Sequence, residues 1–152
     1  MTAPILFHPD SESVAVAWLS AVLPVGVATS LPKPGTWSTF SGTVQGFATV
    51  TIAGGATSDY GLRTPVVSVG TWASVPGSDA PQWGAAAALA ELVVAECLMI
   101  VPSVRTVRKS VKYAEALVQS VRLNAEPRRI PDQDASAAHF ETEFVLVWTE
   151  KS

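Results

Sequence analysis

The chain contains one cysteine and two histidines among its 152 residues. An intramolecular disulfide is therefore excluded, and Cys97, His8 and His139 are too far apart in the sequence to indicate a metal site. No serine lies in a Gly-x-Ser-x-Gly motif or at a recognisable spacing from either histidine, as a hydrolytic nucleophile would. We therefore expect no metal, no cofactor and no enzymatic activity.

Charged residues are also few, at 15% of the chain against about 25% in a typical soluble protein. Apolar residues make up 48%, which favours a surface that contacts other protein. Residues 84–101 form an 18-residue, mostly apolar run. Glu91 and Glu96 would each cost about 2–4 kcal/mol inside a bilayer, so this run predicts a buried or interface helix and no membrane partner.

The N-terminus has neither the basic region nor the sustained apolar region of a secretory signal, so we expect synthesis in a cytoplasm.

Hydrophobic periodicity and the positions of proline and glycine predict two helices and five strands. Asp10 is suited to cap the first helix and Asp79 the second, which Pro102 ends. The pair Gly54-Gly55 predicts a turn after the second strand. In chain order, the expected elements are a helix at 11–23, strands at 25–31, 47–53 and 65–72, a helix between Asp79 and Pro102, and strands at 116–123 and 140–148.

This order, α-β-β-β-α-β-β, predicts an α+β fold in a single domain spanning residues 1–152. We expect a mostly antiparallel sheet of about five strands with two helices packed on one face. The last strand alternates, because its aromatic and aliphatic side chains fall on one face and Glu141 and Glu143 on the other. Residues 127–134 predict a loop or a long hairpin tip.

The net charge of −3 conceals a basic region at residues 103–129, which contains seven basic residues and only two acidic ones. Such a cluster suits a protein interface, a solvated loop or contact with phosphates. The low pI of 5.3 and the lack of interleaved aromatic residues argue against a dedicated nucleic-acid binder.

Seven segments taken together carry a family resemblance: 10–19, 24–32, 54–55, 63–73, 83–91, 126–132 and the closing strand. In this order they resemble the tail terminator proteins of long-tailed bacteriophages of the siphovirus type, particularly those that infect actinobacteria. The chain departs from that pattern in its longer central Pro/Gly loops and in the basic run at residues 105–112.

The resemblance implies a structural virion protein at the head-tail junction, assembled in the host cytoplasm. Such proteins form a ring, typically a hexamer, that caps the head-proximal end of the tail tube, stops its polymerisation and joins the tail to the head connector. The implied partners are further copies of the chain, the major tail tube protein, the connector (stopper) protein, and genomic DNA that passes through the lumen without sequence-specific binding.

We expect the ring contact to use the exposed sheet edge and the arm around Arg63, with the 105–112 loop facing the lumen or the next ring. The candidate residues for contacts between subunits or rings are Tyr60, Arg63, Arg105, Arg108, Lys109, Lys112, Arg128 and Arg129.

Two other interpretations stay open. Another virion ring, such as a head-tail connector or a tail-tube subunit, would have a similar small α+β architecture, but a tube subunit would form extended polymers. A small cytoplasmic enzyme or ligand-binding domain would be monomeric or dimeric and would carry convergent polar groups in a pocket.

Overall fold

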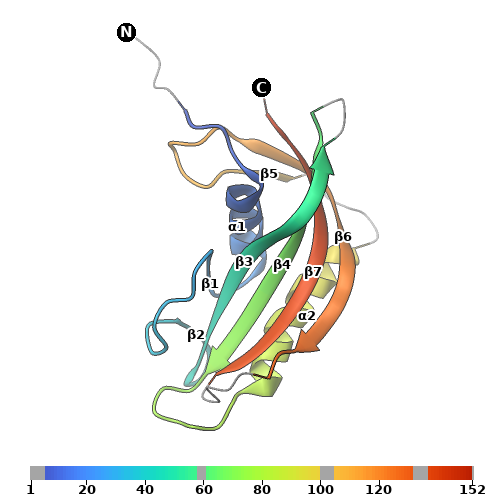
Figure 1. Ribbon diagram of the computed structural model, residues 1–152. Helices are drawn as coiled ribbons and strands as arrows, with labels where there is room; N and C mark the ends of the chain where they lie inside the picture. Colours follow the sequence, from blue (N-terminus) through green and yellow to red (C-terminus); the bar gives the residue numbers. More distant parts are fainter. Residues whose placement is uncertain (1–5, 58–60, 100–104, 132–136, 152) are drawn as a thin grey trace.

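The computed structural model describes residues 6–57, 61–99, 105–131 and 137–151 (Figure 1). These residues form two helices and one seven-stranded sheet. The elements are α1 (Ser11–Val22), β1 (Gly26–Ala28), β2 (Ser38–Ser41), β3 (Val44–Thr57), β4 (Arg63–Ser74), α2 (Trp83–Cys97), β5 (Arg105–Val107), β6 (Ala116–Arg129) and β7 (Ala138–Glu150).

The strands lie in the order β1-β3-β4-β7-β6-β5, and β2 also pairs with β3. Only the β1–β3 pair is parallel among these, so the predicted α+β class with a mostly antiparallel sheet is confirmed. The predicted count of about five strands and the predicted order were wrong, because β2 and β5 were missed. These strands are four and three residues long, too short to show an alternating pattern.

The four long strands curve around α1 and α2, which both lie on the concave side of the sheet (Figure 1). One core cluster joins both helices to the sheet. Trp18 of α1 packs on Phe144 of β7, with ring centroids 5.1 Å apart, while Leu89 and Val93 of α2 are fully buried in the same cluster. The alternation predicted for β7 is confirmed at Thr142, Phe144, Leu146 and Trp148, which are all buried, while Phe140 is half-buried and Val145 is buried on the other face.

The start of α1 follows the prediction. Asp10 accepts a hydrogen bond from the Ser13 amide at 2.6 Å, and the Ser13 hydroxyl oxygen accepts one from the Asp10 amide at 3.1 Å. This reciprocal cap satisfies amides that the first turn would otherwise leave unpaired. The helix ends at Val22, two residues before Pro24.

The cap predicted for the second helix was wrong. Gln82 occupies the N-cap position of α2, without a side-chain capping bond, and Asp79 is exposed in the preceding loop. Pro81 disfavours helical backbone at the residue before it, so the helix begins only after the proline and leaves Asp79 too far away. The predicted stop at Pro102 lies outside the described residues.

Two predicted loops are parts of strands. Gly54 and Gly55 lie within β3 at a bulge, with φ of 133° and 135°, so that the strand bends there instead of turning back. Residues 127–129, predicted as part of a loop, belong to β6, where register shifts between Leu123 and Arg128 accommodate Pro127.

Candidate functional site

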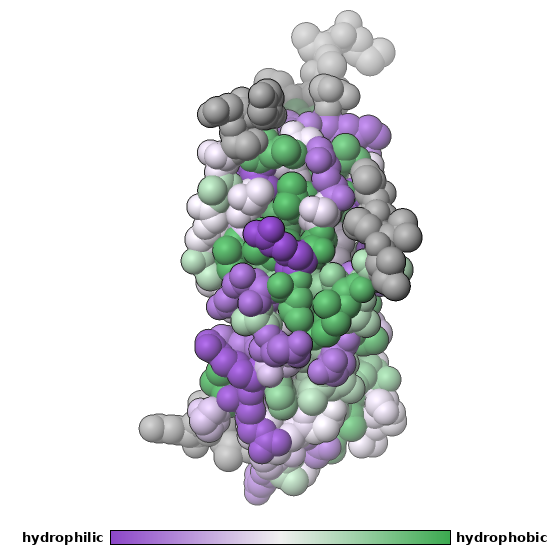
Figure 2. Space-filling model, turned by 90° about the vertical axis from the view of Figure 1, so that its right-hand side faces the viewer, coloured by the Kyte–Doolittle hydropathy of each residue, from purple (hydrophilic) through white to green (hydrophobic). Residues whose placement is uncertain are grey.

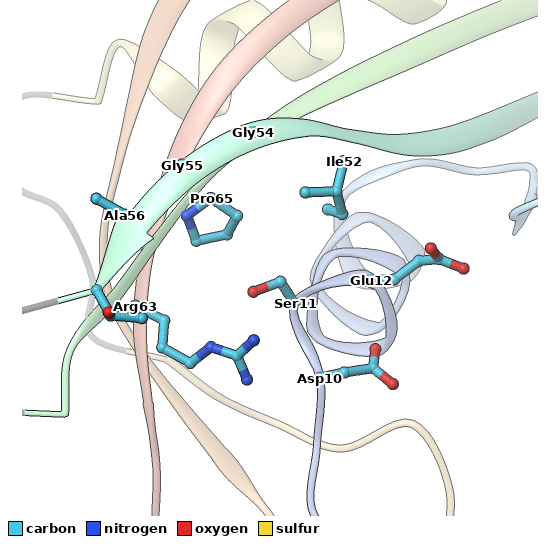
Figure 3. A pocket seen from close by; sticks show the side chains of 10 residues that line it. Asp10, Ser11, Glu12, Ile52, Gly54, Gly55, Ala56, Arg63 and Pro65 are labelled. Atoms are coloured by element: carbon cyan, nitrogen blue, oxygen red, sulfur yellow. The ribbon is translucent and has the colours of Figure 1, made fainter.

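A groove of about 560 Å³ lies between the first turn of α1 and one end of the β3–β4 pair. We call this end the arm; it comprises residues 54–57 of β3 and 63–65 of β4. Asp10, Ser11 and Glu12 line the helix side of the groove, and the arm lines the other side with Ile52 (Figure 3).

The arm is shaped by the glycine bulge and by an unpaired strand edge. Among the described residues, β1 and β2 pair with β3 only at residues 44–49. From Val50 to Thr57, β3 is paired with β4 on one side, and its other edge adjoins the groove. Such an edge carries backbone donors and acceptors that can pair with another chain.

Arg63 extends across the groove toward the start of α1 (Figure 3). Its guanidinium carbon lies 4.8 Å from the centre of the Trp148 ring, which favours the cation electrostatically. The Trp148 indole Nε1 donates a hydrogen bond to the Ser11 hydroxyl at 3.1 Å. Arg63, Trp148 and Ser11 therefore tie the arm, β7 and α1 together at the base of the groove.

The groove carries charge of both signs. Asp10 and Glu12 are exposed at its helix side, and Arg63 is half-buried at its base. Asp10 is already engaged in capping α1. The lining contains carboxylates, a guanidinium, hydroxyls and backbone groups together with the apolar Ile52 and Ala56, a set suited to binding a chain segment with both polar and apolar side chains.

The basic run at residues 105–112, predicted as a loop, begins in strand β5 and continues as an ordered loop from Arg108. Arg108 donates from Nε to the Tyr113 carbonyl at 2.6 Å and from Nη2 to the Val111 carbonyl at 3.0 Å. Lys109 lies 5.2 Å from the centre of the Tyr113 ring. We call residues 108–113 the basic knob. The N-terminal segment holds it from the side, because the Phe7 amide donates to the Lys112 carbonyl at 2.7 Å and the Phe7 carbonyl accepts from the Ala114 amide at 2.9 Å.

The structure divides the predicted contact residues into separate groups. Arg63 lies in the groove, and Arg108, Lys109 and Lys112 lie in the knob. Arg128 and Arg129 lie at the far end of β6, roughly 40 Å along the strand from its start. Tyr60 lies outside the described residues.

The other three arginines also contact partners within the chain. Arg105 pairs with Glu96 of α2 at 3.7 Å, and Arg128 pairs with Glu141 of β7 at 3.4 Å. The Arg129 guanidinium lies 4.3 Å from the centre of the Trp83 ring at the start of α2. Each of these side chains therefore contacts a neighbouring element of its own chain.

The sequence predicted apolar surface that contacts protein and an interface helix at residues 84–101, but it did not identify which of these residues are exposed. Leu92 on α2 is 42% exposed, and Leu98 and Met99 just beyond the helix are 61% and 53% exposed. Figure 2 shows apolar side chains gathered on the face that lies at the right of Figure 1, bordered by polar ones. Because α2 is apolar almost all round, its sequence does not indicate which side faces solvent.

Neither a metal cluster nor a membrane span is found in the part of the chain that the structure describes. No group of three or more His, Cys, Asp or Glu residues there is placed to hold a metal ion. Among the same residues, no helix is long and apolar enough to cross a membrane.

Cys97 is buried at the end of α2. Burial raises the pKa of its thiol from the ordinary 9.0 to about 12, and the Glu96 carboxylate adds to the rise. The stability that this group contributes is fully present below the unfolded pKa of 9.0 and is lost as the pH rises through about 12.

We expect an aromatic disulfide reagent at pH 8 to label Cys97 roughly a hundredfold or more slowly in the folded chain than in urea. A Val111→Cys variant provides the exposed control thiol, which should react at once. Equal labelling rates for folded and unfolded Cys97 would contradict the buried placement.

Comparison with known proteins assigns no family, since no family model matches the chain and no curated protein matches it significantly.

Proposed function

We propose that the chain is a structural subunit of a bacteriophage virion: a tail terminator that forms a ring, typically of six subunits, on the head-proximal end of the tail tube. In this proposal the ring stops tube polymerisation and joins the tail to the head-tail connector. Its partners are further copies of itself, the major tail tube protein and the connector, while genomic DNA passes through its lumen.

The observation that carries the proposal is the presence of two separate apolar surfaces on one small chain. One consists of Leu92, Leu98 and Met99 at the end of α2. The other consists of Val111 in the knob, which is 79% exposed, and Phe7 beside the knob, which is 59% exposed. Apolar surface of this kind marks protein contacts, and a terminator subunit must contact its ring neighbours as well as the tube and the connector.

The separation of charge supports the same proposal. The knob carries Arg108, Lys109 and Lys112, whereas Asp10 and Glu12 lie at the groove. Complementary charged surfaces on one molecule favour association in a defined orientation. This arrangement suits an assembling subunit and a non-catalytic role.

The experiment adds the purified chain to the polymerising tail tube protein and measures tube length by negative-stain microscopy. A terminator should shorten the tubes at substoichiometric amounts and leave a ring on one end of each. Incorporation of the chain along the whole tube would instead favour a tube subunit. A chain that stays monomeric and leaves tube length unchanged would favour a ligand-binding domain, with the groove as its site.

A further inference from the structure

We infer that the groove binds the basic knob of a second copy of this chain, so that successive copies join head to tail. The inference rests on the proposed ring and specifies the contact that builds it. It follows from the shape, the charge and the placement of the two surfaces.

The groove is an acceptor that the fold leaves open. It holds about 560 Å³ and adjoins the edge of β3 that pairs with no other described strand. Ile52, which is half-buried, and Ala56, which is exposed, supply apolar surface to its lining, and Asp10 and Glu12 supply negative charge. A short projecting segment with an apolar tip and basic flanks would match this lining.

The knob has these properties. Val111, at its tip, is 79% exposed, and Lys109 and Lys112 flank it. The two hydrogen bonds from Arg108 fix the loop's carbonyls in the isolated chain. A preorganised loop loses little conformational entropy on binding, which favours its insertion as a rigid unit.

The charges define how the two surfaces meet. Arg63 is a cation at the base of the groove, so a lysine placed there would be repelled. The favourable arrangement directs Val111 toward Ile52 and Ala56, and the flanking lysines toward Glu12 and Asp10 at the helix side. Opposite charges then meet at the rim, where they steer association.

The knob is held away from the groove of its own chain. Arg108 and Lys109 lie beside Ser13 and Ala17 on one side of α1, whereas Ser11 and Glu12 line the groove on another side. The backbone bonds between the knob and Phe7 fix this separation. Because the two surfaces differ, their contact is heterologous, and repetition of it produces a closed ring or a filament.

Disulfide crosslinking between two copies detects this contact whether or not a ring forms. Val111→Cys is placed in one copy of the full chain and Ala56→Cys, on the arm, in another. Cys97 is buried with a raised pKa and stays out of the reaction. Under mild oxidation, the mixture should give crosslinked dimers that contain one chain of each kind, and a copy with both substitutions should give a ladder of crosslinked multimers.

Charge reversal supplies the matched test. Lys112→Glu in the knob or Glu12→Lys in the groove should each reduce trapping more than about tenfold, and the two changes together should restore part of it. Lys33→Glu, a reversal at another exposed loop position, should leave trapping unchanged. Asp10 is kept because it caps α1.

The outcomes separate this inference from the proposed function. Rings that form normally while no mixed crosslink appears would overturn the knob-in-groove contact and leave the terminator proposal standing. Crosslinks confined to pairs of Val111→Cys chains would indicate a symmetric contact and would also overturn it. Mixed crosslinks without any effect on tube growth would support the contact and count against the terminator.

Discussion

Replacing Trp148 with alanine is expected to lower the free energy of unfolding by about 3–5 kcal/mol. Trp148 is 1% exposed on the concave face of β7 and packs within the core cluster that includes both helices. The change removes a large buried side chain and leaves a cavity. It also leaves the Ser11 hydroxyl without its indole donor and withdraws the ring that Arg63 covers.

Urea denaturation monitored by circular dichroism measures this effect. Trp148→Phe is the matched control, because it keeps most of the aromatic volume and loses chiefly the hydrogen bond to Ser11, at a cost of about 1–3 kcal/mol. The expected order of stability is wild type, then Phe, then Ala. A Trp148→Ala chain within about 1 kcal/mol of wild type would contradict the role given to this residue.

Replacing Gly55 with alanine is expected to distort the arm and to lower the free energy of unfolding by more than about 3 kcal/mol. The φ of Gly55 is 135°, a conformation that residues with a side chain rarely adopt. In addition, a Cβ at this position would lie 2.5 Å from the Cα of Pro65 and 2.5 Å from the carbonyl oxygen of Thr64. Both are backbone atoms, so relief requires movement of β4.

Gly54→Ala separates the two causes. The φ of Gly54 is 133°, but an added Cβ would meet nothing within 4 Å. This variant should therefore show the conformational strain alone, at about 1–3 kcal/mol. Denaturation curves measure stability, and amide exchange along residues 50–57 locates the damage. Equal losses in the free energy of unfolding for the two variants would contradict a close approach of β3 and β4 at Gly55.

The elements predicted well from the sequence are those in which local signals agree with the tertiary contacts. Asp10 and Ser13 form a local cap, and the alternation in β7 matches one buried face. The errors arose where distant strands decide the structure. Gly54 and Gly55 predict a turn by composition. Both residues pair with β4, however, so β3 continues through them.

The candidate site was predicted less completely than the fold. The sequence directed attention to Arg63 and to the basic run, and these now belong to the groove and the knob. The sequence did not indicate Glu12 as a residue of the groove or Val111 as a residue of the contact surface. The exposure of these side chains and the shape of the groove depend on how α1 lies between β3 and β5. A valine within a basic run has no signal of its own until the loop places it at the tip.

The measurement that tests the central claim most directly is the mass of the assembled particle, by sedimentation or native mass spectrometry, with and without tail tube protein. We expect either one closed species at a fixed multiple of 15.9 kDa, formed by the chain alone, or a particle that holds a fixed number of copies of the chain bound to the tube protein. A chain that stays at 15.9 kDa under both conditions would contradict it.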